Sequence, residues 1–355
     1  MKKILIINPF GIGDVLFTAP LIKAIKDNFP NSFIGYWCNE KMRSILEKNP
    51  DINIIFAFSR GDFKKIFAQA KFKAIGFFLK LLKKIKKEKF DLAFDLSLDR
   101  RYTFFLRLLG ILRVIGFDYK NRGRLLTDKI QIDYFRDKHV IEYHLELLKF
   151  INIKPTQVRP EPPFLKNKKN NAKDLLERVG LSDRDLIIGI APGAGISWGK
   201  NASFKHWSAI KYAQLSDRLI NELRAKVLLL GDEQEEYIAN TILKNMRNNP
   251  AVLVGKTSLE DLVYVIGNLN LLITNDGGPL HLGVASGIKT VSIFGPVDER
   301  VYGPYPITDM HIVIKKDIKC RPCYKNFRFS GCSNNRRCLD DITVDEVYSA
   351  VKELI

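Results

Sequence analysis

The sequence of 355 residues has no long apolar run, and this absence limits where the protein can act. A membrane-spanning helix needs about 18 or more consecutive apolar residues, and no such stretch occurs. The amino terminus, MKKILIINPF, begins with lysines, but its apolar run is short and no small-residue cleavage site follows. We therefore expect neither a membrane span nor a signal peptide, and we expect a cytoplasmic protein.

Acidic residues are scarce relative to basic ones. There are 39 Asp and Glu against 57 Lys and Arg, which gives a formal net charge of +18. This excess favours a polyanionic partner, which could be a nucleic acid, an anionic membrane surface or a phosphorylated substrate. The alternative is a solvated, lysine-rich surface. No nucleic-acid recognition module is recognisable in the sequence, so we expect no nucleic-acid partner.

Cysteine is also sparse, with five residues in the chain. Cys38 stands alone and is expected to be a buried thiol. The other four are clustered near the carboxyl terminus, in CRPCYKNFRFSGCSNNRRC: Cys320, Cys323, Cys332 and Cys338. A C-x2-C pair followed by two more cysteines permits a zinc site, but the spacing matches no common zinc module. Zinc ligands, disulfides and free thiols all stay open for these four, and we assign no metal ligand.

Short apolar segments alternate with helix-length segments along the whole chain. The pattern runs from ILIIN at residues 3–7 to TVSIFG at residues 290–295. Strands that alternate with helices predict a mostly parallel sheet covered by helices on both faces. A stretch rich in proline, lysine and asparagine interrupts the pattern, and we place a linker at residues 161–174. We therefore expect two doubly wound α/β domains, residues 1–160 and 175–355.

Lysines are concentrated in residues 64–89, KKIFAQAKFKAIGFFLKLLKKIKKEK. Five apolar residues of the surrounding segment could share one helix face, with lysines on the other: Phe67, Ile75, Phe78, Leu82 and Ile85. A basic amphipathic helix is typical of proteins that bind an anionic membrane surface. The alternative is a helix that covers the sheet and has a lysine-rich outer face.

The stretch NDGGPLHLG, residues 275–283, carries the strongest chemical signal. It follows an expected strand, and Pro279 suits the first position of a helix, where its missing N–H is no loss. Gly277 and Gly278 permit close approach of a ligand, and the free N–H groups of a helix start favour an anion. His281 can add a donor, and Asp276 ends the strand. A phosphate-bearing ligand explains why these residue types occur together. The alternative is a tight turn in which Asp276 caps the helix.

Two further positions follow expected strands in the same half of the chain. Lys205 lies near a helix start after the loop APGAG and could place a point charge on a phosphate. Glu233, in LLLGDEQEE, could accept hydrogen bonds from ribose hydroxyls. Taken singly, each position is also compatible with an ordinary solvated side chain.

The amino-terminal loop NPFGIGD is rich in glycine but lacks both the G-x-G-x-x-G spacing and a Walker A lysine. Its distinctive residue is Asp14, at the start of a helix. Aspartate in this place usually caps the helix. A catalytic base is the second interpretation, and the two interpretations predict different effects of mutation.

These blocks, in this order, resemble glycosyltransferase family 9, the ADP-heptose–lipopolysaccharide heptosyltransferases. The resemblance covers the whole chain and is most specific in GIGDVL and NDGGPLH, while the cysteine tail resembles the heptosyltransferase II branch. It implies the GT-B fold, in which two Rossmann-like domains face each other across a cleft. The donor then binds the carboxyl-terminal domain and the acceptor binds the amino-terminal one.

The resemblance also assigns roles to residues. Asp14 matches the general base, Lys205 the lysine on the donor phosphates, and Glu233 the acidic residue near the ribose. The donor loop is matched by Asp276, Gly277, Gly278 and His281, although threonine is usual where this chain has Gly277. Position and charge add three candidate acceptor contacts: Arg100, Arg101 and Lys120.

The implied activity is inverting transfer of heptose from ADP-heptose to the inner core of lipopolysaccharide, without a cofactor. The donor loop carries no D-x-D metal motif. The acceptor would be an anionic glycolipid, which gives the basic segment 64–89 a purpose at the cytoplasmic face of the inner membrane. A GT-B enzyme that uses a UDP- or GDP-linked sugar for another surface glycan is the alternative.

Overall fold

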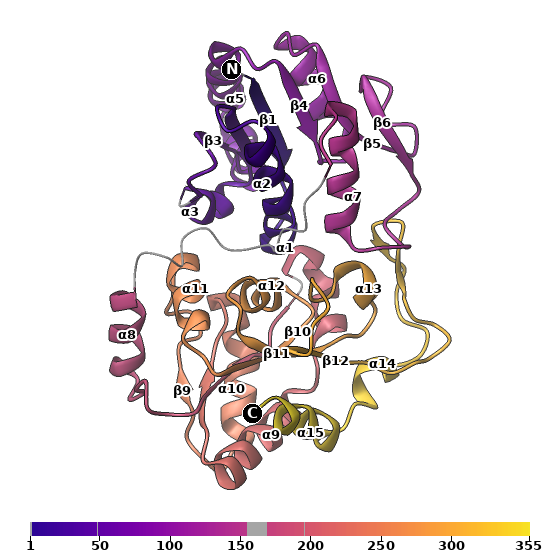
Figure 1. Cartoon of the computed structure of the whole chain (residues 1–355). Helices are drawn as coiled ribbons and strands as arrows, with labels where there is room; N and C mark the ends of the chain where they lie inside the picture. Colours follow the sequence, from indigo (N-terminus) through magenta and orange to yellow (C-terminus); the bar gives the residue numbers. More distant parts are fainter. Residues whose placement is uncertain (1, 48, 155–168, 195) are drawn as a thin grey trace. The chain divides into compact units, whose positions relative to one another are not determined.

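The computed structural model describes residues 2–47, 49–154, 169–194 and 196–355. The chain divides into two compact units, Met1–Pro163 and Phe164–Ile355, each with its own parallel sheet (Figure 1). The expected α/β class is therefore confirmed. Of the expected linker, residues 161–168 lie outside the described residues, whereas residues 169–174 belong to a helix. That helix can begin earlier than we expected because both prolines of the expected linker, Pro162 and Pro163, precede it.

The amino-terminal unit has a six-stranded sheet in the order β3-β2-β1-β4-β5-β6, and every pairing is parallel. Its strands are β1 Lys3–Asn8, β2 Phe33–Cys38, β3 Ile54–Ala57, β4 Leu92–Asp95, β5 Arg113–Tyr119 and β6 Asp128–Ile132. Its α-helices are α1 Ile12–Leu16, α2 Ala19–Asn28, α3 Arg43–Leu46, α4 Arg60–Gln69, α5 Lys71–Glu88, α6 Arg100–Leu108 and α7 Val140–Glu146, with 3-10 turns at Glu40–Met42 and Leu147–Ile151.

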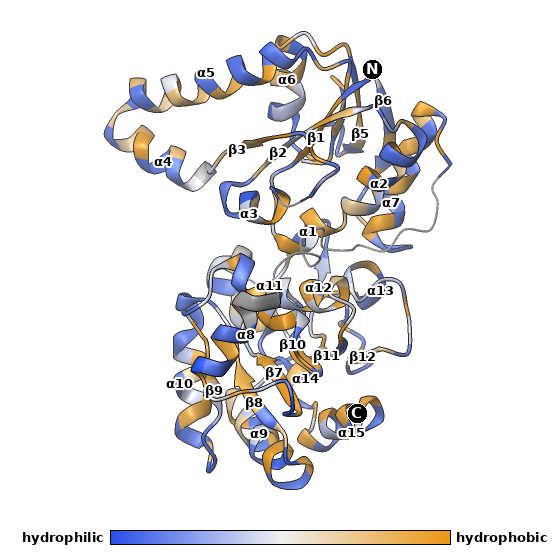
Figure 2. Cartoon of the chain, turned by 60° about the vertical axis from the view of Figure 1, so that its left-hand side comes forward, coloured by the Kyte–Doolittle hydropathy of each residue, from blue (hydrophilic) through white to orange (hydrophobic). Residues whose placement is uncertain are grey.

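Alternation along β1 shows how helices come to cover both faces of this sheet. Leu5 and Ile7 share a buried cluster with residues of α5 and α6. The equally buried Ile4 and Ile6 point to the opposite face, because successive side chains of a strand alternate. Helices α2 and α7 pack against each other in the same unit (Figure 2). An apolar run buried on both sides is what a central parallel strand requires.

The carboxyl-terminal unit repeats the topology, with the parallel order β12-β11-β10-β7-β8-β9. Its strands are β7 Ile187–Ala191, β8 Lys226–Leu229, β9 Ala251–Val252, β10 Leu271–Asn275, β11 Lys289–Ile293 and β12 His311–Ile314, followed by the antiparallel pair β13 Tyr324–Lys325 and β14 Arg328–Phe329. Its α-helices are α8 Lys169–Arg178, α9 Ala209–Leu223, α10 Glu236–Asn245, α11 Leu259–Gly267, α12 Gly278–Ala285, α13 Glu299–Tyr302, α14 Arg337–Asp340 and α15 Val344–Leu354, with 3-10 segments η3 Ile196–Lys205 and η4 Glu233–Glu235.

Each sheet has one point at which the direction of strand order reverses. In the amino-terminal sheet this switch point lies between β1 and β4, and in the carboxyl-terminal sheet it lies between β7 and β10. Loops at the carboxyl ends of two such strands diverge and leave a crevice where α/β proteins bind ligands. The loops after β1, β4, β7 and β10 are therefore the places where sites are expected.

The lysine-rich segment forms two helices rather than one. Ala70 separates α4 from α5, so Phe67 lies on a different helix from Phe78, Leu82 and Ile85. The last three pack on the sheet, whereas Ile75 is 42% exposed, so the single apolar face that we expected is wrong for Phe67 and Ile75. Within the described residues, no helix is both long enough and apolar enough to span a bilayer.

Candidate functional site

The loop after β10 has the form expected of an anion site. Gly277 precedes the first turn of α12, and Pro279 occupies its start. The loop passes close to the loop that follows β7, because a Cβ atom on Gly277 would lie 3.2 Å from the Cβ atom of Ala194. The N–H groups of the first helical turn therefore point out of a narrow, half-buried strand-to-helix turn at the switch point.

Asn275, the last residue of β10, holds the loops of this site together. Its side-chain oxygen accepts a hydrogen bond from Trp207 N at 3.0 Å, and its amide donates to Pro192 O at 2.6 Å. The side chain is fully buried, so both bonds are shielded from water. The loops after β7 and β10 and the chain before α9 are thus fixed in one arrangement.

Lys205 and Asp276 form a buried ion pair at the same place. Lys205 Nζ lies 2.6 Å from Asp276 Oδ2, and both side chains are at least nine-tenths buried. The same ammonium lies 5.0 Å from the ring centre of Trp198, within range of a cation–π contact. The structure therefore brings together two of the residues predicted from separate loops, 71 positions apart in the sequence.

His281 lies in the first turn of α12 and is 8% exposed. Burial lowers the pKa of its imidazole to about 3, and the charge of Lys205 lowers it further. His281 is therefore neutral near pH 7 and can give a ligand one N–H donor but no positive charge. The positive charge of the site comes from Lys205 and from the helix N-terminus.

Among the acidic residues that follow β8, Glu235 lies against the loop after β7; the ribose contact predicted for Glu233 stays a prediction. Glu233 is exposed at the start of η4. Glu235 accepts a hydrogen bond from Asp232 N at 3.1 Å and lies against Gly193, where a Cβ atom would overlap its carboxylate. Burial raises the pKa of Glu235 to about 7. The signal that could have found it is the pair of glycines, Gly193 and Gly231, that leave room for its side chain.

The cysteine-rich segment supports this site from one side. Trp198 stacks between Tyr324 and Phe329, with ring centres 5.1 Å apart in each pair. Arg336 donates to His206 O at 2.7 Å, next to Lys205. The hairpin β13–β14 and the chain after it therefore hold the Trp198 ring over which the Lys205 ammonium lies.

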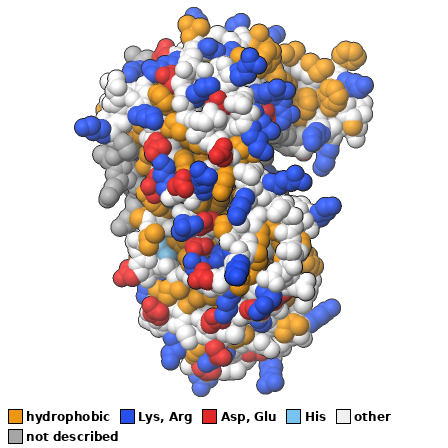
Figure 3. Space-filling model, turned by 90° about the vertical axis from the view of Figure 1, so that its right-hand side faces the viewer, with side chains coloured by type: hydrophobic (Ala, Val, Ile, Leu, Met, Phe, Trp, Pro, Cys, Tyr) orange, Lys and Arg blue, Asp and Glu red, His pale blue; other side chains and the backbone are white. Residues whose placement is uncertain are grey.

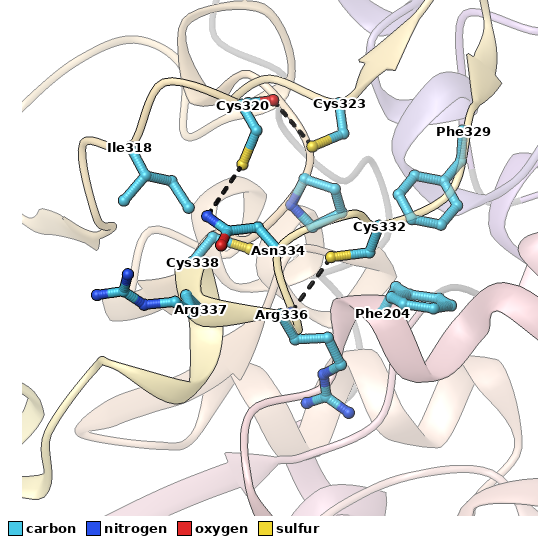
Figure 4. Close-up of a pocket in the computed structure, with 11 residues that line it drawn as sticks. Phe204, Ile318, Cys320, Cys323, Phe329, Cys332, Asn334, Arg336, Arg337 and Cys338 are labelled. Atoms are coloured by element: carbon cyan, nitrogen blue, oxygen red, sulfur yellow. Dashed lines mark hydrogen bonds between the residues drawn. The ribbon is translucent and has the colours of Figure 1, made fainter.

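The four clustered cysteines converge on one small cavity of about 10 Å³, shown in Figure 4. All five cysteines of the chain are free thiols. Cys323 Sγ donates to Cys320 O at 2.9 Å, and Cys332 Sγ accepts from Arg336 N at 3.2 Å. Burial raises the pKa of Cys323 to about 11, which keeps it protonated. In the described part of the chain, no three His, Cys, Asp or Glu residues are arranged to hold a metal ion.

Asp14 lies on α1, directly after the switch-point strand β1. Its Oδ2 accepts from Gly11 N at 3.3 Å, and Asn8 Nδ2 donates to the Asp14 carbonyl at 2.9 Å. The first contact is the reciprocal part of a helix cap, so one carboxylate oxygen has a structural role. The carboxyl group is only half buried. The general-base role stays a prediction.

The three candidate acceptor contacts follow the next two strands of that sheet. Arg100 and Arg101 begin α6 after β4, and Lys120 follows β5; all three are exposed. Arg101 forms a forked pair with Asp99, with Nη2–Oδ2 at 2.5 Å. Lys120 lies over the Tyr119 ring at 5.1 Å, and Arg122, which the sequence did not single out, lies 5.3 Å from it. Positive charge thus gathers at the carboxyl ends of β4 and β5.

Comparison with known proteins shows the family of this chain. The family model of glycosyltransferase family 9 (heptosyltransferase) matches residues 78–332, so the chain belongs to this family and is a glycosyltransferase. It is 26% identical to lipooligosaccharide heptosyltransferase 2 of Campylobacter jejuni over 99% of both chains. It is 25% identical to lipopolysaccharide heptosyltransferase 2 of Escherichia coli over 83% of both chains.

Solved structures match the whole chain as well. The glycosyl transferase family 9 protein of Veillonella parvula has a TM-score of 0.83 at 22% identity and covers 99% of this chain and 97% of its own. The ADP-heptose lps heptosyltransferase II of E. coli has a TM-score of 0.77 at 21% identity, over 100% and 98%. These similarities confirm the predicted GT-B class of fold.

Proposed function

We propose that this glycosyltransferase transfers a heptose from ADP-heptose to the inner core of a lipopolysaccharide or lipooligosaccharide, with inversion at the anomeric carbon. Family membership and the heptosyltransferases among its relatives support the sugar and the acceptor class. The observation that carries the proposal is the buried Lys205–Asp276 pair at the start of α12, at the switch point of the carboxyl-terminal sheet.

The donor diphosphate would lie at the N-terminus of α12. Gly277 and Gly278 leave the backbone N–H groups accessible, and Lys205, held by Asp276, supplies an ammonium group. The neutral His281 donates one hydrogen bond. On the ribose, Glu233 is the contact that the family resemblance implies, and Glu235 is the contact that its position against Gly193 favours. Donor affinities of Glu233→Gln and Glu235→Gln decide between the two.

The chemistry is a single displacement. An acceptor hydroxyl oxygen forms a bond to the anomeric carbon while the bond from that carbon to the diphosphate oxygen breaks. Asp14 takes the hydroxyl proton, a role worth about 10²–10⁴-fold in rate. Lys205, His281 and the helix N-terminus stabilise the negative charge that develops on the departing ADP.

The acceptor is proposed to be an anionic glycolipid that contacts Arg100, Arg101 and Lys120. These side chains are exposed and lie beyond β4 and β5, where a bulky substrate can reach them. The enzyme would act at the cytoplasmic face of the inner membrane, with the basic segment 64–89 on the anionic surface.

The donor proposal is tested by thermal shift and by transfer. ADP-heptose is expected to raise the melting temperature and to support transfer to a heptose-deficient core acceptor. A UDP- or GDP-sugar that stabilises the protein while ADP-heptose does not would contradict the proposal in favour of another GT-B activity. His281→Ala should weaken binding of ADP-heptose and slow turnover, and a variant with unchanged constants would remove His281 from the site.

A further inference from the structure

Helix α5 presents a second set of hydrophobic side chains, separate from the set that packs on the sheet. The packed set consists of Ala74, Phe78, Leu81, Leu82 and Ile85. The outer set is Phe72, Ile75 and Leu79, which are 92%, 42% and 50% exposed, whereas Phe77, which is also exposed, stacks on Phe58. Their spacing of three and four residues places them along one side of the helix. Packing within the unit does not account for this stripe.

The stripe lies near the tip of a helical hairpin. Only Ala70 separates α4 from α5, and Phe67, near the end of α4, is 37% exposed. Figure 2 shows the turn between the two helices as the part of the hairpin farthest from the sheet, with hydrophobic residues on both helices. The large apolar side chains at this projecting tip do not cover the sheet of their own unit. They are suited to bury themselves in an apolar environment outside the protein.

Positive charge surrounds the stripe. Helix α5 has seven lysines and one acidic residue, Glu88, which pairs with Lys3 at 3.5 Å. In the part of the chain that the structure describes, none of these seven lysines forms an ion pair. In Figure 3, the upper right of the molecule, where the hairpin projects, shows hydrophobic side chains bordered by Lys and Arg. The partner of such a surface must be both apolar and anionic.

We propose that the α4–α5 hairpin is a membrane-inserting element, in which Phe72, Ile75 and Leu79 enter an anionic bilayer and the lysines contact its headgroups. An amphipathic helix with lysines beside its apolar face binds membranes in this way. A second copy of the chain is a poor partner, because it would bring seven more lysines against these seven. This inference rests on the proposed function, because an enzyme that acts on a lipid-linked acceptor has to work at the membrane surface.

The test separates insertion from charge. Binding of the full chain is measured by co-sedimentation with vesicles of phosphatidylethanolamine and phosphatidylglycerol, and with pure phosphatidylcholine, at about 0.1 M and about 0.5 M NaCl. The variants are Phe72→Ser/Leu79→Ser and the quadruple Lys-to-Gln change at Lys83, Lys84, Lys86 and Lys87. The control is Ile307→Ser/Tyr237→Ser, which removes side chains that are 90% and 61% exposed on the other unit.

The wild type and the control should keep binding to anionic vesicles at the higher salt. Phe72→Ser/Leu79→Ser should bind about 10- to 100-fold more weakly at both salts, because each large apolar side chain adds strongly to partitioning. The lysine variant should lose binding chiefly at the lower salt. The tryptophan fluorescence of a Phe72→Trp variant should be quenched by brominated acyl chains. The melting temperature of this variant is measured to show that its fold is intact.

Equal vesicle binding by the wild type and Phe72→Ser/Leu79→Ser would overturn the proposal. So would a wild type that is dimeric in solution while the variant is monomeric, with vesicle binding unchanged, because the stripe would then be a subunit interface. Transfer of heptose to a delipidated core acceptor is measured in parallel. If transfer fails while the vesicle results hold, the proposed function is wrong and the insertion stands; the reverse result rejects the insertion alone.

Discussion

The two units share one topology but use their switch points differently. In the carboxyl-terminal unit, the loops beyond β7 and β10 are joined by buried groups: Asn275, Lys205 and Asp276. In the amino-terminal unit, the corresponding loops carry exposed charges such as Arg100 and Arg101. A fixed, buried set of donors suits a small diphosphate, whereas an open basic surface suits a large anionic acceptor. We therefore expect the same strand order to support both halves of the proposed transfer reaction.

The amino-terminal switch point should contain the residue with the largest effect on catalysis. Asp14→Asn is expected to lower turnover by about 10²-fold or more, because asparagine cannot take the proton from the acceptor hydroxyl. Asparagine caps a helix about as well as aspartate, so the melting temperature and the donor affinity should stay near wild type. Turnover is measured with saturating ADP-heptose.

Asp99→Asn is the matched control for Asp14→Asn. Asp99 also caps a helix next to the switch point, but its carboxylate is held by Arg101. We expect turnover of this variant to stay within a few-fold of wild type. If the two variants exchange these outcomes, Asp99 is the base and Asp14 is a cap.

Lys205→Met should weaken donor binding by about tenfold or more, the usual worth of a charge-assisted hydrogen bond. It should also lower the melting temperature, because it leaves the Asp276 carboxylate buried without its partner, a loss of about 3–5 kcal/mol. Donor affinity is measured by titration calorimetry.

Adding Asp276→Asn to Lys205→Met separates the two effects. The double variant should regain most of the stability, because no unpaired charge remains, but it should not regain donor affinity. Recovery of both would mean that Lys205 acts only through the fold of the loop and makes no contact with the diphosphate.

The sequence predicted the alternation of strands and helices in both units and the turn before Pro279, but not every strand. Strands β6 and β12, which we did not predict, lie at sheet edges and bury their residues only in part. A central strand such as β10, with every residue buried, gives the continuous apolar run that is easy to recognise. Hydrophobic pattern is therefore informative where burial is complete.

The positions of candidate site residues were predictable where a sequence motif fixes the backbone. They were less predictable where only packing fixes the position of the side chain. The glycines before Pro279 indicate the turn into α12. The Lys205–Asp276 pair joins two loops that are distant in sequence, so the sequence suggested both residues without the contact between them. We did not distinguish Glu235 from Glu233, because the signal for its inward position is the space beside two glycines, Gly193 and Gly231, of which Gly193 lies on another loop.

Substitutions at the candidate acceptor contacts should have a smaller effect on the enzyme kinetics. Arg101→Gln and Lys120→Gln are each expected to raise the acceptor KM a few-fold and to leave the donor KM unchanged, since exposed charges contribute only modestly. Arg300→Gln is the matched control, because Arg300 forms the same forked pair with a helix-capping aspartate, Asp298, in the other unit. Equal effects of Arg101→Gln and Arg300→Gln on the acceptor KM would remove Arg101 from the acceptor surface.

The smallest predicted effect is a loss of folding stability at acidic pH, and it differs between the two units. Burial lowers the pKa of His144 to about 4 in the amino-terminal unit, and lowers the pKa values of His206, His281 and His311 in the other. Burial opposes protonation of each imidazole in the folded protein, so below the ordinary histidine pKa of about 6.5 the unfolded chain binds these protons more readily. Stability is therefore full above about pH 6.5 and is lost as the pH falls, more so in the carboxyl-terminal unit.

Glu235 opposes this trend, because an acid with a raised pKa stabilises the fold as the pH falls from about 7 toward its ordinary value. At about pH 5.5, a fully buried neutral histidine costs about 1 kcal/mol, or about 2–4 °C in melting temperature for units of this size. The drop in melting temperature between about pH 7.5 and 5.5 should shrink by that amount in His281→Gln and in His144→Gln. A drop of unchanged size in His281→Gln would mean that this imidazole titrates in the folded protein as it does in the unfolded chain, and that burial does not keep it neutral at about pH 5.5.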